Sequence, residues 1–409
     1  MAGVSLLELA WPVLGRVPAL ARRAVPAIAR VLLARDNDAA EWAANALRKL
    51  GADALMPVRE LLRSQSPLDR RAGALACERL GTASIALLPV LIETLGDADA
   101  EVRADVADAL SAYGPAGVAA TSCLTEALAD LAERVRDRAA MALGMIGAGS
   151  RLAIPALVRA LVDPSPQVRT RAAWALARIG EEAVPPLVES LRHADPTIRA
   201  GAAFALGEMD RTAAPTVPAL IAALEDGVAS VRQQAARALA KIGTAAAAAV
   251  PALMRMLADD DQEVRQEAAV AVWNTGADGA ALQPLMNALY DPVIEVRKWA
   301  AVTLGAIRKG VVAAVPVLRR ALDDDDREVR QGAAWSLGEI FREEPRAASP
   351  ALLHALASHD LTVRQRAIWA LWRYGGPGVL DVEALTRALG DVDPMVRYFA
   401  NAALERLGR

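Results

Sequence analysis

The chain has 409 residues and a formal net charge of −3, and 54% of its residues are hydrophobic although only 4% are aromatic. This length exceeds what one hydrophobic core serves, so the chain holds either several domains or an array of repeats. The slightly negative charge argues against a dedicated nucleic-acid coat protein.

The N-terminal segment is apolar, but it carries Glu8 and lacks a basic region, so we expect a capping helix over residues 1–16 rather than a signal peptide. No run of eighteen uninterrupted apolar residues occurs, and no membrane span is expected. Cys77 and Cys123 form no CxxC motif, which indicates two free thiols in a reducing compartment. We therefore expect a cytoplasmic protein.

From residue 17 onward, one phrase recurs with a period close to 33 residues. An arginine, usually preceded by valine, marks the same place in each copy and is called the reference arginine. The reference arginines are Arg70, Arg103, Arg136, Arg169, Arg199, Arg232, Arg265, Arg297, Arg330, Arg364 and Arg397. Self-similarity at this period predicts stacked repeats, and we count twelve of them over residues 17–409, forming a single continuous domain.

Each repeat is predicted to contain two helices. The second helix is exemplified by residues 166–179, where Ser165 is the N-cap, Pro166 the first helical residue and Gly180 the end signal. Its apolar residues share one face: Val168, Ala172, Leu176 and Ile179. Glycines end most second helices: Gly51, Gly81, Gly114, Gly147, Gly180, Gly243, Gly276, Gly375 and Gly408. The first helix carries a proline that starts or kinks it. No strand pattern competes, so the fold class is all-α.

The segment VPALIAALEDGVASVRQQAARALAKIG, residues 217–243, resembles a HEAT repeat, and in particular the subclass named after the phycobilisome lyases. The resemblance extends over roughly residues 17–408, and it depends on proline, aspartate and Val-Arg recurring at fixed offsets. It implies a right-handed superhelical α-α solenoid of about twelve HEAT-like repeats. It also implies that first helices form the convex surface and second helices the concave one.

An aspartate lies six residues before many reference arginines: Asp97, Asp130, Asp163, Asp226, Asp259, Asp291, Asp324 and Asp391. This spacing predicts a bidentate, charge-assisted bond, within or between units, that sets the angle between repeats. The departures are Ala40 in place of the arginine, and Ser64, His193 and Ser358 in place of the aspartate. We expect those junctions to be less tightly tied. Arg199, six residues after His193, should then matter less for stability than Arg232 or Arg265.

No cluster of residues supports catalysis or metal binding. The three histidines, His193, His354 and His359, form neither an HExxH motif nor a His-Glu pair. The acidic loops at 259–261 and 323–326 lack the spacing and the glycine of an EF-hand. We expect a protein that is not an enzyme and has no metal or cofactor.

Positions two, five and nine after the reference arginine lie away from the core face of the second helix. Tryptophan flanked by arginine at these positions is typical of an interface anchor. The candidate binding residues are Arg171, Trp174, Arg178, Phe204, Arg237, Lys241, Trp299, Trp335, Arg366, Trp369 and Arg373. In the alternative interpretation, each tryptophan seals the groove between neighbouring repeats. Trp273 and Trp372, at position eight, are expected to be structural.

These features favour a non-enzymatic scaffold or adaptor that binds a partner protein or peptide in its concave groove. The resemblance implies a second possibility, a bilin (tetrapyrrole) lyase-type or chromophore-handling subunit. A third is binding of a nucleic-acid backbone by the concave face. It is disfavoured because acidic residues interrupt the basic stripe: Asp105, Glu208, Glu267 and Glu339.

Overall fold

The computed structural model describes residues 18–34, 37–276, 279–307 and 311–408. The expected capping helix over residues 1–16 lies outside these residues. Contacts between residues divide the chain into two compact units, Met1–Met209 and Asp210–Arg409. Each unit is described by itself below, and the single continuous domain stays a prediction.

The described part of the first unit contains six helix pairs. Their bounds are α2 Pro18–Val31, α3 Asn37–Leu50, α4 Leu55–Leu62, α5 Pro67–Leu80, α6 Leu88–Thr94, α7 Ala100–Ser111, α8 Thr121–Ala127, α9 Glu133–Ile146, α10 Ile154–Ala160, α11 Pro166–Ile179, α12 Val184–Ser190 and α13 Pro196–Glu208. Short 3-10 turns begin at the end of most second helices and lead into the next first helix; they are η1 Gly51–Ala54, η2 Gly81–Leu87, η3 Gly114–Ala120, η4 Gly147–Ala153 and η5 Glu181–Ala183.

The second unit repeats this arrangement in its described residues. Its helices are α14 Val217–Ala223, α15 Ala229–Ile242, α16 Val250–Met256, α17 Gln262–Thr275, α18 Leu282–Ala288, α19 Ile294–Ala306, α20 Val315–Ala321, α21 Arg327–Glu343, α22 Pro345–Ala355, α23 Leu361–Tyr374, α24 Val382–Ala388 and α25 Pro394–Arg406. Its 3-10 turns are η6 Asp210–Thr216, η7 Gly243–Ala249, η8 Gly279–Ala281 and η9 Val311–Ala314. The described residues therefore hold the predicted twelve helix pairs and no strand, which confirms an all-α solenoid.

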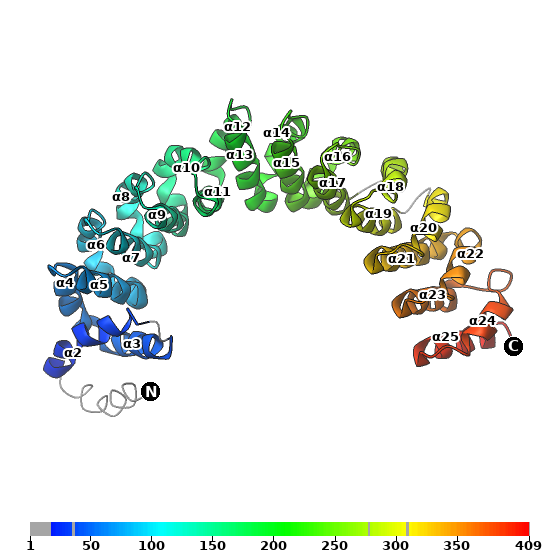
Figure 1. Ribbon diagram of the computed structural model, residues 1–409, viewed down its shortest axis with the longest axis horizontal. Coiled ribbons are helices and arrows are strands. Elements are labelled where there is room, and N and C mark those ends of the chain that lie inside the picture. The colour runs from blue at the N-terminus through cyan, green and yellow to red at the C-terminus, as the bar shows by residue number, and fades with distance from the viewer. Residues whose placement is uncertain (1–17, 35–36, 277–278, 308–310, 409) are drawn as a thin grey trace. The chain divides into compact units, whose positions relative to one another are not determined.

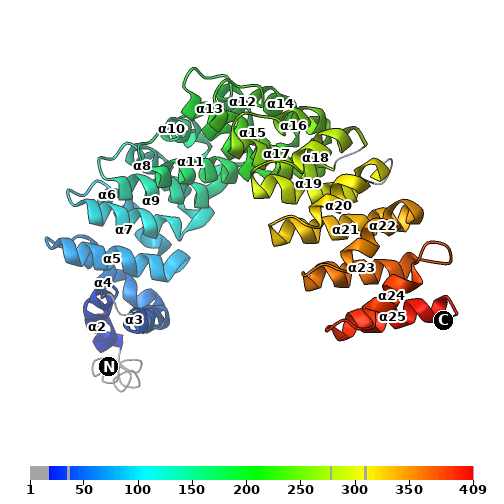
Figure 2. The same ribbon diagram turned by 45° about the vertical axis from the view of Figure 1, so that its right-hand side comes forward.

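Within each unit the helices form two layers. Figure 1 shows the first, even-numbered helices side by side in one layer and the second, odd-numbered helices in the other, and Figure 2 shows the same order from a second direction. The predicted apolar face lies between the layers, since Val168, Ala172 and Leu176 are completely buried. Alanine four residues after the reference arginine is buried as well, and its small side chain lets neighbouring second helices approach closely.

The helix boundaries follow the sequence signals with one exception. Proline occupies the first turn of α6, α10, α12, α14, α16 and α20, so it starts these helices and does not kink them. The predicted end glycines have positive φ angles, except Gly375, which has φ −75°. A Cβ at Gly375 would overlap the side chain of Leu380. Gly375 is therefore needed for close packing, not for a left-handed turn.

Three stretches of 28 residues have the length and composition of membrane-spanning helices: Pro67–Thr94, Glu133–Ala160 and Ala229–Met256. Each is a second helix, a 3-10 turn and the following first helix. Gly81, Gly147 and Gly243, all at positive φ, separate the helices. Their apolar residues pack against adjacent repeats in the core of the solenoid. This packing explains why these stretches are hydrophobic.

A ladder of arginine–aspartate pairs joins successive repeats. Arg103 of α7 donates from Nε and Nη2 to the carboxylate of Asp130 at 2.7 and 2.9 Å. Its Nη1 donates to the carbonyl oxygens of Asp97 and Ala98 at 2.7 and 3.1 Å. The same fork is made by Arg70–Asp97, Arg136–Asp163, Arg232–Asp259, Arg265–Asp291, Arg297–Asp324 and Arg364–Asp391. The bidentate bond is therefore between repeats, while the aspartate six residues earlier supplies its backbone carbonyl.

Because each fork runs to the following repeat, a missing aspartate weakens the bond of the arginine in the repeat before it. In the repeat after Arg169, His193 takes the sequence position of the ladder aspartate, and Arg169 donates to the carbonyls of Asp163 and Pro164 at 2.8 and 3.1 Å. His193 Nδ1 accepts the backbone N–H of Asp195 at 3.0 Å, so it replaces the aspartate in the turn but not in the ion pair. The expectation for Arg199 rested on counting back six residues, whereas each fork above runs to a carboxylate in the following repeat. The effect of Arg199 on stability stays a prediction.

The ladder is altered, but not lost, at Ser358. Arg330 of α21 is 8% exposed, and its Nη2 lies 3.4 Å from Oδ2 of Asp360, two residues beyond Ser358. Its Nη1 donates to the carbonyls of Asp324 and Asp325 at 2.8 and 2.9 Å. A single long contact thus replaces the fork at this junction.

Candidate interaction surface

The candidate binding residues all lie on second helices, and the structure brings most of them together in three groups. The first group is on α11, the second spans α17, α19 and α21, and the third is on α23. Phe204 on α13 and Lys241 on α15 are half-buried, and Arg237 on α15 is exposed.

The first group is built around Trp174, which is half-buried. Its ring lies against Gly144 of α9, where an added Cβ would overlap the indole. The guanidinium groups of Arg171 and Arg178 each lie 5.9 Å from the ring centroid. Arg171 also approaches a carboxylate oxygen of Asp137 at 3.4 Å. Trp174 is therefore partly accessible, as predicted, but it also seals the contact between α9 and α11.

Asp105 on α7 is bound by arginines from the second helices on either side, α5 and α9. Asp105 of α7 has a side chain only 2% exposed, and it accepts from Arg71 at 2.7 Å and from Arg134 at 2.8 Å. The prediction that Asp105 interrupts an exposed basic stripe was wrong, since this carboxylate is buried and paired. Burial raises the pKa of the neighbouring Asp108 to about 6, although Arg138 lies 3.2 Å away.

The second group is a cluster of three tryptophans on consecutive second helices. The ring centroid of Trp273 is 6.3 Å from those of both Trp299 and Trp335, and all three side chains are half-buried. Lys298 lies 5.8 Å from the ring centroid of Trp299 and forms an ion pair with Glu328. Trp273, expected to be structural, joins Trp299 and Trp335 into one aromatic surface, which sequence offsets alone did not reveal.

The third group contains the most exposed tryptophan among the candidates. Trp369 is 41% exposed, and its ring meets that of Tyr374 edge-on at 5.8 Å. Arg373 is exposed and lies 5.8 Å from the Tyr374 ring centroid. Arg366 differs: it is half-buried, and it donates to the carbonyl of Gln331 at 2.6 Å. Burial lowers the pKa of Arg366, so this residue ties α23 to α21 more than it presents a charge to solvent.

One further pocket was not indicated by the sequence. A cavity of about 490 Å³ lies beside the turns that follow α18 and α20, lined by residues that include Tyr290, Arg320 and Asp323. Arg320 stacks on the exposed Tyr290 ring at 4.8 Å. Among the described residues, no group of three or more His, Cys, Asp or Glu side chains could hold a metal ion.

The family follows from the repeats themselves. The model for HEAT repeats matches residues 55–144, 121–193, 184–273 and 282–372. The chain belongs to the HEAT repeat family. A search among curated proteins finds no match to this HEAT-repeat chain.

Several solved structures share the HEAT-repeat fold. Kap95p, in a study of its binding to RanGDP, is 16% identical with a TM-score of 0.57, over 96% of this chain and 61% of that one. Kap121p bound to Ste12p is 15% identical with a TM-score of 0.63, over 99% of this chain and 51% of that one. Kap121p bound to the extreme C-terminus of the protein phosphatase Cdc14p is 16% identical with a TM-score of 0.60, over 93% of this chain and 49% of that one. The present chain thus spans about half to three-fifths of these karyopherins, and the likeness shows the fold alone.

Proposed function

We propose that this HEAT-repeat chain is a non-enzymatic, cytoplasmic scaffold that binds a protein or peptide on the concave surface formed by its second helices. The observation that carries the proposal is the recurrence of partly accessible tryptophan at one position of these helices, with two arginines beside the ring at Trp174. Trp174, Trp335 and Trp369 each lie five residues after a reference arginine, and each remains partly accessible. Within each unit, successive repeats offer such positions one after another, which suits an extended partner better than a small substrate.

The solved relatives support this proposal at the level of architecture. Kap121p is found bound to segments of other proteins, namely Ste12p and the extreme C-terminus of Cdc14p. A similar stack of helices can therefore hold a polypeptide. The identity of the partner is not carried over, because these relatives are about 15% identical and roughly twice as long.

A test compares the second-helix surface with an exposed apolar residue elsewhere. Partners captured by the full chain are cross-linked and the contact sites are mapped by mass spectrometry. The double substitution Trp335→Ala with Trp369→Ala should weaken the free energy of partner binding by about 2 kcal/mol or more. Aromatic anchors that become buried on binding dominate protein interfaces. Leu152→Ala is the matched control, because Leu152 is 80% exposed and lies on η4, outside the second helices. Cross-links confined to first helices and turns would refute the proposal.

The similarity to the phycobilisome-lyase subclass keeps bilin handling as a second candidate. The arrangement that favours it is Trp174 with Arg171 and Arg178 both 5.9 Å from its ring, because a flat tetrapyrrole carries two propionates that could meet two guanidiniums. Mixing the protein with biliverdin should then shift the bilin absorbance spectrum. Arg171→Gln with Arg178→Gln should abolish that shift, and an unchanged spectrum with the wild-type chain would exclude this candidate.

A further inference from the structure

The second helices α23 and α25 concentrate aromatic side chains in a chain that has few of them. Five of the fifteen aromatic residues lie on these two helices: Trp369, Trp372, Tyr374, Tyr398 and Phe399. They divide into a half-buried base, Trp372 and Phe399, and an outer part that includes the exposed Trp369 and Tyr398. This division makes the α23–α25 surface a candidate site in its own right.

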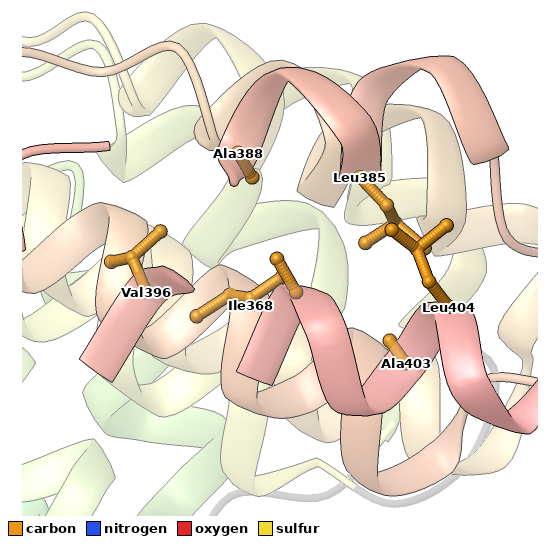
Figure 3. Packing of buried hydrophobic residues seen from close by; sticks show 7 residues of the cluster. Ile368, Leu385, Ala388, Val396, Ala403 and Leu404 are labelled. Atoms are coloured by element: carbon orange, nitrogen blue, oxygen red, sulfur yellow. The ribbon is translucent and has the colours of Figure 1, made fainter. Parts of the chain in front are cut away.

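The base of the α23–α25 surface is packed against the core of the second unit. Trp372 and Phe399 lie 4.8 Å apart, so they join α23 to α25. Both pack against a cluster that includes Ile368, Leu385 and Leu404. Figure 3 shows these three side chains pointing into the space between α23, α24 and α25. The surface is therefore rigid before any partner arrives, which lowers the entropic cost of binding.

The outer part presents large aromatic groups to solvent. Trp369 is 41% exposed and Tyr398 is 67% exposed. Tyr374 braces the edge of Trp369, and Phe399 lies 5.3 Å from Tyr398. Large aromatic side chains are enriched at protein interfaces, and Trp369 is packed against a neighbouring ring as an anchor residue is.

The charge beside these rings is positive. Helix α23 contains no acidic residue. Arg373 and Arg406 lie nine residues after their reference arginines on adjacent helices, and both are exposed. Arg406 donates to the carbonyl of Trp372, so its guanidinium lies beside the aromatic base. Neither arginine is paired with a carboxylate within the described part of the chain, whereas Arg342 on α21 is paired with Glu339 and Glu343.

We propose that the α23–α25 surface binds an acidic peptide segment that carries an aromatic or large apolar side chain. The apolar side chain packs beside Trp369 and Tyr398, and the flanking carboxylates pair with Arg373 and Arg406. This inference rests on the proposed scaffold function and names the chemistry of one partner segment. A nucleic acid fits less well, because regularly spaced phosphates are matched by a run of cations, whereas this surface presents two exposed arginines together with two exposed aromatic side chains.

The test uses the full chain and fluorescence anisotropy with a labelled peptide in which pairs of glutamates alternate with phenylalanine. Three further probes are the same peptide with lysine for glutamate, with alanine for phenylalanine, and an oligothymidylate. We expect saturable binding of the acidic aromatic peptide alone. Trp369→Ala should weaken it about 30-fold, and Arg373→Gln with Arg406→Gln about tenfold with a reduced salt dependence.

Arg79→Gln is the matched control, because Arg79 has the same repeat position and exposure as Arg373 but lies in the first unit and is not among the candidate binding residues. It should leave the affinity within about twofold. Trp369→Phe should restore much of the loss, and thermal melts confirm that each variant is folded. Equal binding of the lysine peptide, tighter binding of the oligonucleotide, or no saturable binding of the acidic peptide would overturn the inference. If the peptide binds but responds only to Trp335→Ala, this inference fails and the scaffold function stands.

Discussion

The ladder between repeats makes a quantitative prediction about Arg103 and Arg169. Arg103→Ala removes two charge-assisted hydrogen bonds to Asp130, whose side chain is only 14% exposed. It also leaves that carboxylate with one remaining donor, the backbone N–H of Ala132 at 2.8 Å. Hydrogen bonds to charged groups contribute about 1.5–3 kcal/mol, and breaking a fully buried ion pair costs about 3–5 kcal/mol. We expect a loss of about 3 kcal/mol for this partly buried pair.

Arg169→Ala should cost much less. Its guanidinium donates to two carbonyls, and His193 stands at the ladder position where a carboxylate would be. We expect a loss of about 1 kcal/mol, so the two substitutions should differ by about 2 kcal/mol. Arg103→Lys is the control, because an ammonium keeps the charge but cannot form the planar fork, and its cost should be intermediate.

Hydrogen exchange followed by mass spectrometry measures both losses where they arise. A solenoid unfolds in parts, so local exchange is a better measure than one global free energy. Amides of α7 and α9 should exchange about 100-fold faster in Arg103→Ala, and amides of α11 only several-fold faster in Arg169→Ala. An equal increase of the exchange rates in the two variants would refute the claim that the carboxylate of the following repeat stabilises the junction.

Three further predictions concern local geometry and pH. Asp210 has φ 50° at the place where other repeats carry glycine. Asp210→Gly should therefore stabilise the protein by up to about 1 kcal/mol in urea unfolding, and Gly243→Ala should destabilise it by a similar amount. Gly144→Ala should destabilise because its Cβ would overlap Trp174, and the double substitution with Trp174→Ala should cost less than the sum of the two single substitutions. The hydrogen bond from Arg103 lowers the pKa of Asp130, so the ladder's contribution is complete above about pH 5 and is lost as the pH falls through the carboxyl range. The urea midpoints of wild type and Arg103→Ala should therefore converge toward pH 3; a constant difference would contradict this linkage.

The repeat architecture was predictable because each unit carries its own local signals. Pro166 after Ser165 starts a helix, Gly180 ends it, and the apolar spacing selects the buried face, all within one repeat. These signals depend on backbone geometry and on side chains a few residues apart, so they are readable without knowing the neighbours. The twelve helix pairs and their boundaries follow from them.

The interaction surface could be predicted only in outline. Helical position correctly indicated that Trp174 and Trp335 are partly accessible. It did not show that Trp174 lies on Gly144 of the preceding repeat, nor that Trp335 belongs to a cluster with Trp273. Both facts depend on how far one second helix is displaced along the next, which the spacing within a repeat does not specify.

The sequence by itself determined the period, the two helices of each unit and the polar residues available to join the units. The tertiary structure decided which of those residues meet. Arg103 bonds to Asp130, 27 residues later, and not to the side chain of Asp97, six residues earlier, because stacking brings the next turn under the guanidinium. The same stacking buries Asp105 between Arg71 and Arg134. Arg169, which is followed in the next repeat by His193 in place of the aspartate, donates to two backbone carbonyls. Contacts between repeats depend on the relative placement of whole helices, which no single repeat encodes.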